Sequence, residues 1–215
     1  MITDIHTHKI VFNSFSIVDI SDNFNNLQNV NFFSIGIHPK FIDNNYENIL
    51  LEISKLADNQ NCKAIGECGI DIYSNFNINI QKSIFIKQIE IAQHKHKPII
   101  IHCVKAYSEI ISALKITKFQ FPIILHSYNG NLHDTQQFLR YENVFFSFSD
   151  KCKIPNCGAQ KSLKFIPINK ILVETDNSDF KIDDTVKFIS TFSNLDYNTL
   201  INSINTNFEK IIKVS

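Results

Sequence analysis

The chain has 215 residues, of which 44% are hydrophobic and 20% are charged, the ordinary balance of a soluble globular protein. Lys plus Arg equals Asp plus Glu at 21 each, so the zero formal charge excludes a broadly basic, nucleic-acid-coating protein, and any such contact has to be local. No stretch approaches the roughly 18–20 uninterrupted apolar residues of a membrane span, so we expect no membrane partner. A single, monomeric domain over residues 1–215 is expected.

Cysteine usage and the first residues bear on location. Charged and polar residues interrupt the segment from Met1 to Lys9 early, which argues against a signal peptide. The five cysteines are scattered and form no CxxC pair, so a reduced, cytoplasmic protein is expected. Cys152 and Cys157 could pair or share a metal ion, but two free thiols in a loop are the favoured interpretation.

Short apolar runs rich in Ile, Val and Phe recur along the chain and predict strands. They are Ile2–His6, Phe12–Val18, Asn31–Ile37, Lys63–Glu67, Pro98–His102, Pro122–His126, Val144–Phe148 and Lys170–Glu174. Several are apolar without alternation, as strands buried on both faces are. Pro98 and Pro122 each stand at a strand start, where a missing N–H does little harm.

Longer polar–apolar segments between these runs predict helices. The stronger ones are Asn45–Leu56, Gln81–His96, Ala106–Ile116, His133–Tyr141, Asp183–Phe192 and Tyr197–Ile212, and the weaker ones are Asp19–Gln28 and Gly158–Phe165. Asp183 and Asp196 are candidate N-caps. The Asn-rich stretches 23–31 and 75–79 predict loops.

Strands that alternate with helices predict a parallel α/β architecture. Eight such units are the count of a (β/α)8 barrel of the TIM type. That barrel takes about 250 residues, so this compact chain requires short loops. A doubly wound open sheet is the structural alternative.

Residues of the metal-ligand type end five of these runs, at the strand ends where such a barrel carries its active site. They are His6, His8, Glu67, His102, His126 and Asp176. Any one of them alone is more often a hydrogen-bonded structural residue. Together, imidazoles and carboxylates on one rim form a costly polar cluster unless a cation binds there. The set therefore predicts a site for divalent metal ions.

The spacing within the first run refines this prediction. Asp4, His6 and His8 are two residues apart on a strand and point the same way, so the two imidazoles can bind one ion. Asp4 lies one pleat deeper and is expected to orient a metal-bound His. The full set is too large for one four-coordinate ion and fits two ions about 3.5–4 Å apart, with one carboxylate bridging. Zn, Mn and Mg are the candidates.

Motifs around these residues stand in a fixed order. They are Asp4-Ile5-His6-Thr7-His8, Gly36-Ile37-His38-Pro39, Gly66-Glu67-Cys68-Gly69-Ile70-Asp71, Pro98-Ile99-Ile100-Ile101-His102, Leu125-His126-Ser127-Tyr128-Asn129-Gly130 and Glu174-Thr175-Asp176. In order and spacing the sequence resembles the TatD family of metal-dependent hydrolases over nearly its whole length. Asn205-Thr206-Asn207-Phe208 is similar to the family's closing helix.

The resemblance implies a role for each candidate. His6, His8 and Asp176 would bind one ion, and His102 and His126 the other. Glu67 would bridge the two ions, and Asp176 could also take a proton from the attacking water. The implied reaction is hydrolysis of DNA phosphodiesters, often from the 3′ end, so the partner is a nucleic-acid end or a small phosphoester. Ester or amide cleavage on a small molecule or aminoacyl-tRNA is the alternative, and a non-catalytic metal-binding protein is the second.

The sequence departs from the family pattern in three places. A polar-Arg-Asp stretch is usual where Cys103-Val104-Lys105 stands, a further His where Lys40 stands, and Ala-Pro-aromatic where Asn177-Ser178-Asp179 stands. These departures leave the predicted metal ligands complete and change residues that would contact the substrate.

Three residues are candidate substrate contacts. His38 ends the third run and either contacts the substrate or makes a buried structural hydrogen bond. Lys105 follows His102 in a loop and could hold a phosphate. Tyr73 could stack on a base, although packing within its loop is the commoner fate of such a residue.

Other reactive or basic residues have plainer interpretations. Strand alternation turns Cys68 and Cys103 away from the lumen, so both are interpreted as packing residues. The basic cluster 94–97 precedes a strand and so belongs to the opposite face of the barrel, as a solvated helix end.

Overall fold

Eight strands form one parallel sheet in the order in which they occur along the chain. The computed structural model describes residues 1–10, 15–21 and 30–214, with side chains through residue 213. The strands are β1 (Asp4–Thr7), β2 (Ser16–Asp19), β3 (Phe32–Ile35), β4 (Cys62–Asp71), β5 (Ile99–Val104), β6 (Ile123–Leu125), β7 (Val144–Phe148) and β8 (Ile171–Val173). Each strand pairs in parallel with the next, from β1 through β8.

The sheet closes where the chain after β8 meets β1. Thr7 and Asp176 form a parallel bridge, in which His8 N donates to Asp176 O (3.1 Å) and Asp176 N donates to His6 O (3.0 Å). The prediction of a (β/α)8 barrel is confirmed. The open doubly wound sheet is wrong, because its strand order would reverse in the middle of the sheet.

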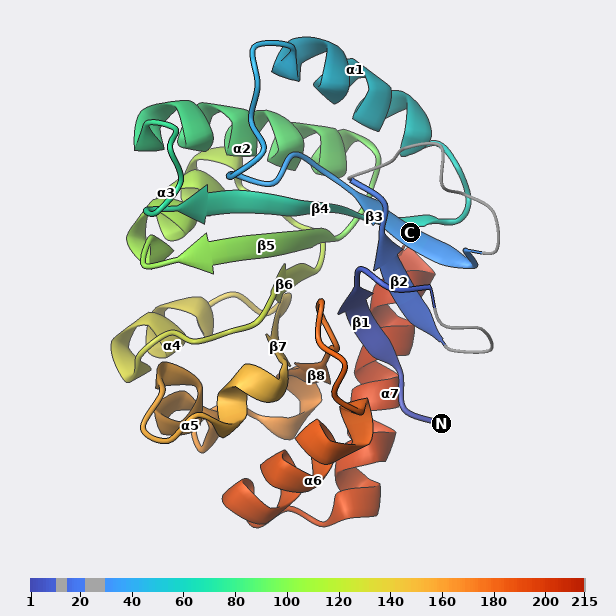
Figure 1. Cartoon of the computed structure of the whole chain (residues 1–215), viewed down its shortest axis with the longest axis vertical. Helices are drawn as coiled ribbons and strands as arrows, with labels where there is room; N and C mark the ends of the chain where they lie inside the picture. The colour runs from blue at the N-terminus through green and yellow to red at the C-terminus, as the bar shows by residue number, and fades with distance from the viewer. Residues whose placement is uncertain (11–14, 22–29, 215) are drawn as a thin grey trace.

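Helices surround the strands, with α1 to α3 on one side of the barrel and α4 to α6 on the other in Figure 1. They are α1 (Tyr46–Leu56), α2 (Ile78–His94), α3 (Tyr107–Thr117), α4 (Leu132–Phe138), α5 (Gly158–Leu163), α6 (Ile182–Ser193) and α7 (Tyr197–Val214), with the 3-10 turns η1 (Asp150–Lys153) and η2 (Ile168–Lys170). No helix in the described part of the chain combines the length and hydrophobicity that a membrane crossing needs.

Several element ends differ from the sequence prediction. The weak helix expected over 19–28 and the start of the strand expected at Phe12 fall largely outside the described residues, and Asp19 belongs to β2. α2 begins at Ile78, inside the stretch predicted as a loop, because the Asn77 side chain caps it by accepting from Asn79 N (2.8 Å).

The two candidate N-caps have different outcomes. Asp196 accepts a hydrogen bond from Thr199 N (2.8 Å) at the start of α7, as an N-cap does. Asp183 was the wrong choice for α6, since Lys181 is the N-cap and Asp183 lies in the first turn. An acidic side chain there still favours the helix, because it faces the positive end of the helix dipole.

The barrel interior is a layer of apolar side chains closed from below by α7. Most strands contribute one residue to this layer, which consists of Ile5, Ile17, Ala64, Ile100, Ile124, Phe145 and Leu172 together with Phe208 and Ile211 of α7. Polar side chains of α7 fasten it to the segments that lead into β1 and β8. Thr3 N donates to Asn205 Oδ1 (3.1 Å), and Asn207 Nδ2 donates to Ile171 O (2.9 Å). The N-terminal end of the barrel is thus sealed, and the C-terminal end is left for a site.

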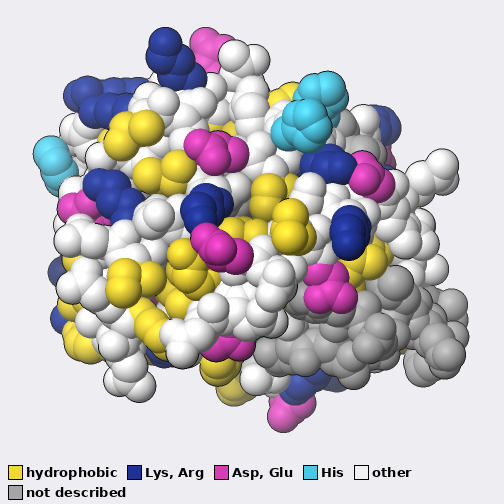
Figure 2. Space-filling model, turned by 90° about the horizontal axis from the view of Figure 1, so that it is seen from above, with side chains coloured by type: hydrophobic (Ala, Val, Ile, Leu, Met, Phe, Trp, Pro, Cys, Tyr) yellow, Lys and Arg dark blue, Asp and Glu magenta, His cyan; other side chains and the backbone are white. Residues whose placement is uncertain are grey.

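The outer surface carries charges of both signs close together. Seen from the α1 side, basic and acidic side chains are interspersed (Figure 2), and Lys95 Nζ lies 2.7 Å from Asp58 Oδ2. The basic cluster at the end of α2 lies beside the start of β4, as expected for the N-terminal face. Lys97 in that cluster is buried and donates to Cys62 O (2.8 Å), so the prediction of a solvated helix end is wrong for this residue.

Substitution of the α7 residue that closes the interior should destabilise the barrel. Phe208 is 1% exposed, so Phe208→Ala leaves a cavity beneath the strands and should lower the free energy of unfolding by about 3–5 kcal/mol. Phe165 is 55% exposed, and Phe165→Ala should change it by no more than about 0.5 kcal/mol. Urea denaturation of both variants measures the difference. Equal losses would contradict the role given to α7.

Candidate metal centre

The six predicted ligands converge at the C-terminal ends of the strands. They come from β1 and the residue after it (His6, His8), β4 (Glu67), β5 (His102) and the segments that follow β6 and β8 (His126, Asp176). Apolar interior residues lie one pleat below several of them, with Ile100 two residues before His102 and Ile124 two residues before His126. Strand alternation therefore carries these imidazoles into the mouth of the barrel.

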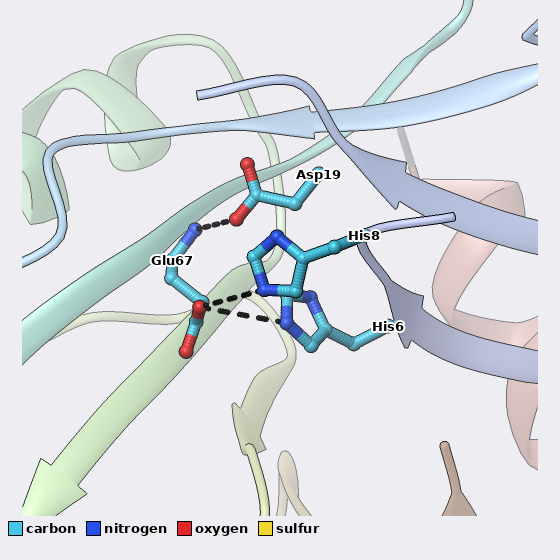
Figure 3. A group of neighbouring side chains, drawn as sticks. All are labelled: His6, His8, Asp19 and Glu67. Atoms are coloured by element: carbon cyan, nitrogen blue, oxygen red, sulfur yellow. Dashed lines mark hydrogen bonds and ion pairs between the residues drawn. The ribbon is translucent and has the colours of Figure 1, made fainter. Parts of the chain in front are cut away.

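The Glu67 carboxylate lies between two pairs of imidazoles. Its Oε2 is 3.5 Å from His6 Nε2 and 3.4 Å from His8 Nε2, and these side chains point toward it in Figure 3. Its Oε1 is 3.0 Å from His126 Nε2 and 3.1 Å from His102 Nδ1. Each carboxylate oxygen thus faces its own pair of nitrogen donors, which is the arrangement a carboxylate between two cations requires.

The surroundings of His6 show whether the cluster suits a metal ion. Its side chain is 0% exposed, and neither ring nitrogen makes a hydrogen bond to any described residue. The rings of His8 and His126 lie against it, with centroids 4.9 Å and 4.4 Å away. Buried nitrogens without a partner are costly, and a cation held among imidazole and carboxylate donors removes that cost. The residues present therefore fit a divalent ion.

Three groups of possible ligand atoms overlap within this cluster. In each group the atoms lie within 4.8 Å of one another, and the groups are His6–His8–Asp19–Glu67, His6–His126–Asp176 and His38–Glu67–His102. His6 belongs to two of them, and so does Glu67. Shared members are what two neighbouring ions with common ligands would produce.

Asp176 is held by a residue that the sequence analysis missed. Asp176 Oδ1 lies 3.7 Å from His8 Nε2, whereas its Oδ2 lies 2.9 Å from Lys151 Nζ. Lys151 belongs to η1, which follows a strand that ends in no ligand-type residue, so only the fold reveals it. The Asp176 backbone is left-handed (φ 54°), an uncommon conformation for a residue other than glycine and one that recurs at functional sites.

Asp19 is a second residue that the sequence analysis missed. Its carboxylate groups with His6, His8 and Glu67, and Asp19 Oδ2 accepts a hydrogen bond from Glu67 N (3.2 Å) (Figure 3). The signal was present, because Asp19 ends the second apolar run just as the ligands end theirs. The sequence analysis instead assigned it to the start of a helix.

His38, predicted as a substrate contact, lies beside the cluster. Its Nε2 is 3.2 Å from His102 Nδ1, and its Nδ1 accepts from Lys40 N (3.1 Å). Burial, reinforced by the neighbouring His102, lowers the pKa of His38 to about 4, so its ring is neutral at physiological pH. A neutral imidazole is the form that binds metal ions. Contact with substrate stays a prediction.

Further carboxylates support the two imidazoles on the β5 and β6 side. His126 Nδ1 lies 2.8 Å from Glu174 Oε1, and the same oxygen accepts from Ser127 N (2.8 Å). His102 Nε2 lies 3.4 Å from Asp71 Oδ2, whose charge is paired with Lys40 Nζ at 3.1 Å. Such partners orient a ligating imidazole and strengthen its donor nitrogen. Glu174 and Asp71 stand inside the motifs of the sequence analysis, but nothing in the sequence assigned them this contact.

Asp4 acts on the backbone and not on an imidazole. Asp4 Oδ1 accepts from His6 N (3.2 Å) and Thr175 N (3.1 Å), and Asp4 Oδ2 accepts from Thr175 Oγ1 (2.7 Å). Asp4 thus contacts the candidate ligand His6 through its backbone N–H, and the expectation that Asp4 orients a metal-bound His stays a prediction. Asp4 ties β1 to the segment after β8, and burial raises its pKa to about 6.

Charges inside the cluster stabilise one another. Burial by itself would raise the pKa of Glu67, but the neighbouring His126 and His6 outweigh it and hold that pKa well below the usual value. Burial would likewise lower the pKa of His126, but Glu174 and Glu67 outweigh it and hold that pKa well above the usual value. A divalent ion competes for the same nitrogen and oxygen atoms, since its ligands must be deprotonated.

A cavity of about 360 Å³ opens beside the cluster. His102 and His126 form one wall, and Lys105, Tyr107, Asn129 and Lys151 line other parts. Lys105 lines this cavity, and its contact with a phosphate stays a prediction. Tyr73 does not line this cavity; it is 63% exposed, and Lys105 Nζ lies 5.3 Å from its ring centroid. Base stacking by Tyr73 stays a prediction.

The cysteines behave largely as the sequence analysis expects. All five are free thiols, including Cys152 and Cys157. Cys68 is buried in the apolar core between strands and helices, as expected, whereas Cys103 packs against that core and also lines the cavity beside the cluster. Burial raises the pKa of Cys103 to about 12, so its thiol is un-ionised and suited to packing.

A (β/α)8 barrel with His and carboxylate side chains gathered at its C-terminal mouth is the arrangement of a class, the metal-dependent hydrolase barrels. Within that class, residues 5–213 match the family described as TatD related DNase, and the chain belongs to this family.

Curated relatives carry several names. An uncharacterized metal-dependent hydrolase from Buchnera aphidicola is 33% identical over 147 residues, which are 67% of this chain and 55% of the relative. A protein named 3′-5′ ssDNA/RNA exonuclease TatD from Pectobacterium carotovorum is 29% identical over 144 residues, which are 66% of this chain and 55% of the relative. A putative deoxyribonuclease TATDN1 homolog from Vairimorpha ceranae is 27% identical over 165 residues, which are 74% of this chain and 58% of the relative. The chain thus spans little more than half the length of these relatives.

A solved structure shares the fold over almost its full length. The crystal structure of YJJV, a TatD homolog from Escherichia coli K12, aligns with a TM-score of 0.83 and covers 98% of this chain and 97% of that one. At 16% sequence identity this likeness shows the fold alone.

Removal of divalent ions should lower the thermal stability of the protein. A ligand at 100 times its Kd stabilises the folded state by about 2.7 kcal/mol, which for a chain of this length corresponds to a Tm shift of about 5–10 °C. Chelation should lower the Tm by this amount, and added Zn²⁺ or Mn²⁺ should raise it again, as measured by calorimetry. Glu67→Gln removes the charge at the centre of the candidate ligand cluster and should abolish most of the shift. An unchanged Tm after complete chelation would exclude a structural contribution from bound metal.

Proposed function

We propose that the chain is a phosphodiesterase that removes nucleotides from the end of a single nucleic-acid strand with the help of two divalent ions. The observation that carries the proposal is the Glu67 carboxylate, whose two oxygens each face a separate pair of imidazoles. Paired cations suit phosphodiester cleavage, because the attacking and leaving oxygens both develop charge.

The ligands divide into two sets. His6, His8 and Asp176 would hold one ion, and His102 and His126 the other. Glu67 would contact both. When bound, the ions lower the pKa of the attacking water and neutralise charge on the phosphate oxygens. Zn, Mn and Mg stay the candidate metals, because mixed nitrogen and oxygen ligands accept all of them.

Asp176 also acts as the general base in this proposal. Lys151 engages Asp176 Oδ2 at 2.9 Å, so Oδ1 is the oxygen that would face both the ion and the attacking water and would accept the proton. Glu67 is not available for this step, because its oxygens are surrounded by imidazoles. Lys151 is thus a positioning residue for Asp176.

The cavity supports a strand end as the substrate. Its volume of about 360 Å³ is at the lower end of the range for small-ligand pockets, so it suits one terminal nucleotide and not a duplex. Lys105 and Lys151 line it and provide positive charge for a phosphate. A relative from Pectobacterium carotovorum is named as a single-strand exonuclease, which agrees with this assignment. That residues 1–215 suffice as one monomeric catalytic domain is part of the proposal.

A substrate panel tests the proposal against ester or amide hydrolysis. The metal-loaded protein is assayed on end-labelled single-stranded DNA and RNA, on bis(p-nitrophenyl) phosphate and on aminoacyl esters. We expect shortening of the oligonucleotides one residue at a time, and loss of activity after chelation. Turnover of the aminoacyl esters without any cleavage of phosphodiesters would overturn the proposal.

Replacement of the general base should abolish hydrolysis without unfolding the protein. Asp176→Asn keeps the shape of the side chain but removes the proton acceptor, and kcat should fall by about 10²–10⁴-fold. Asp179→Asn is the matched control, because the Asp179 side chain is 99% exposed and its ion-pair partner among the described residues is Lys9. Steady-state kinetics and a circular dichroism melt of both variants provide the readout. Normal turnover by Asp176→Asn would exclude this mechanism.

Removal of the cationic wall should weaken substrate binding more than chemistry. Lys105→Ala should raise KM for phosphorylated substrates by about tenfold, the scale of one lost charge-assisted hydrogen bond, with a smaller change in kcat. Lys153→Ala is the matched control, since Lys153 also lies over an aromatic ring, that of Phe180, but does not line the cavity. An equal KM for the two variants would remove Lys105 from the site.

A further inference from the structure

The cavity beside the metal centre continues into two further hollows on the surface. A hollow of about 400 Å³ shares Lys105, Tyr107 and Asn129 with it and adds Lys161 of α5. The next hollow, of about 500 Å³, shares Ser108 and Asp134 with the second and adds Lys115 of α3. Residues shared from one hollow to the next show that the three hollows adjoin, in a row that leads from the cavity across α3, α4 and α5. We call this the strand groove.

The lining of the strand groove is basic although the chain as a whole is neutral. Among the described residues that line the cavity and the two hollows, the lysines are Lys105, Lys115, Lys151 and Lys161 and the acidic residue is Asp134. Asp134 is committed to the capping box of α4, where its side chain accepts from Asn131 N.

Several of these lysines lack a protein counter-charge. Lys151 pairs with Asp176, but in the described residues Lys105, Lys115 and Lys161 form no ion pair with a carboxylate. Elsewhere on the described surface Lys82, Lys87 and Lys95 pair with acidic partners, whereas Lys153 and Lys164 lie over aromatic rings and form no ion pair. Cations without a partner along a groove mark a path for a polyanion.

We propose that the strand groove binds the part of a single-stranded polynucleotide that adjoins the terminal nucleotide, with successive backbone phosphates near Lys105 and Lys161. This proposal rests on the proposed function, because the cleaved end would lie in the cavity. Lys105 belongs to both the cavity and the groove, so it marks the point where the strand leaves the metal centre.

The uncharged lining suits a backbone more than a particular base. Ser108 and Asn129 are exposed side chains that can hydrogen-bond to sugar and phosphate oxygens. The exposed ring of Tyr73, with Lys105 over its face, offers a stacking surface beside the entrance. Binding without sequence preference and with strong salt dependence follows from this composition.

The test compares Lys161→Ala with Lys164→Ala, three residues further along, which removes the same charge. Lys164 is exposed, lies over Phe192 and lines neither the cavity nor the groove. Fluorescence anisotropy measures binding of the metal-loaded proteins to phosphorothioate oligothymidylates and oligouridylates of about two and eight nucleotides, lengths chosen from typical single-strand site sizes.

The unsubstituted protein should bind the longer strand more tightly than the shorter one. Lys161→Ala should reduce this advantage by about fivefold and make the salt dependence of log Kd shallower by about 0.7, the value for one phosphate contact with a single strand. Lys164→Ala should leave both quantities unchanged. The DNA and RNA arms show whether the groove distinguishes the two backbones.

Failure of this inference is separable from failure of the proposed function. If the protein cleaves oligonucleotides but Lys161→Ala and Lys164→Ala keep the same advantage for longer strands, the strand groove is wrong and the metal-centre assignment stands. If the longer strand has no advantage in the unsubstituted protein, the groove is likewise wrong. If the protein cleaves no phosphodiester, the proposed function is wrong. The strand groove is still tested in that case, because the anisotropy experiment measures binding and does not require cleavage.

Discussion

A buried carboxylate surrounded by imidazoles is the constraint on which the rest of the molecule depends. Glu67 is held between two pairs of His nitrogens, and its backbone N–H is held by Asp19. Such a group is expensive to bury unless positive charge accompanies it, whether as protons on the imidazoles or as divalent ions. The outer members of the cluster also have partners of opposite charge. Glu174 lies beside His126, and Lys151 lies beside Asp176. Removal of any member would leave a buried partner uncompensated.

The barrel satisfies this constraint because its two ends differ: one is closed by apolar side chains and the other carries the polar cluster. α7 seals the N-terminal end with Phe208 and Ile211, so the interior layer of apolar side chains is closed and packed. The polar side chains then emerge one pleat higher, on strands whose positions are fixed by the layer beneath them. Rigid strands suit a metal centre, because ligand atoms on several separate segments must stay within a few ångströms of one another.

The charges around the centre are unevenly distributed. On the side of β5 to β7 the mouth continues into the strand groove with its lysines, whereas the outer helices near α1 carry lysines paired with acidic residues. Two of the sequence departures from the family pattern fall at this mouth: Lys105 lines the cavity, and Lys40 pairs with Asp71 beside His102. Both lysines thus lie beside the candidate metal ligands, at positions where the sequence departs from the pattern it otherwise resembles.

Sequence alone determined the class of fold and picked out the candidate ligands that the fold brings together, because both follow from local periodicity. Apolar runs alternate with helical segments, and His or acid residues stand at the ends of the runs, so strand-end positions could be assigned without knowing the barrel. The pairing of Lys151 with Asp176, the contact of Asp19 with Glu67 and the position of His38 against His102 were decided by tertiary structure. These contacts join segments distant in sequence, and the tilt and closure of the sheet set which side chains meet. A helix cap such as that of α6 depends on backbone angles at one residue, and the sequence pattern could not choose between Lys181 and Asp183.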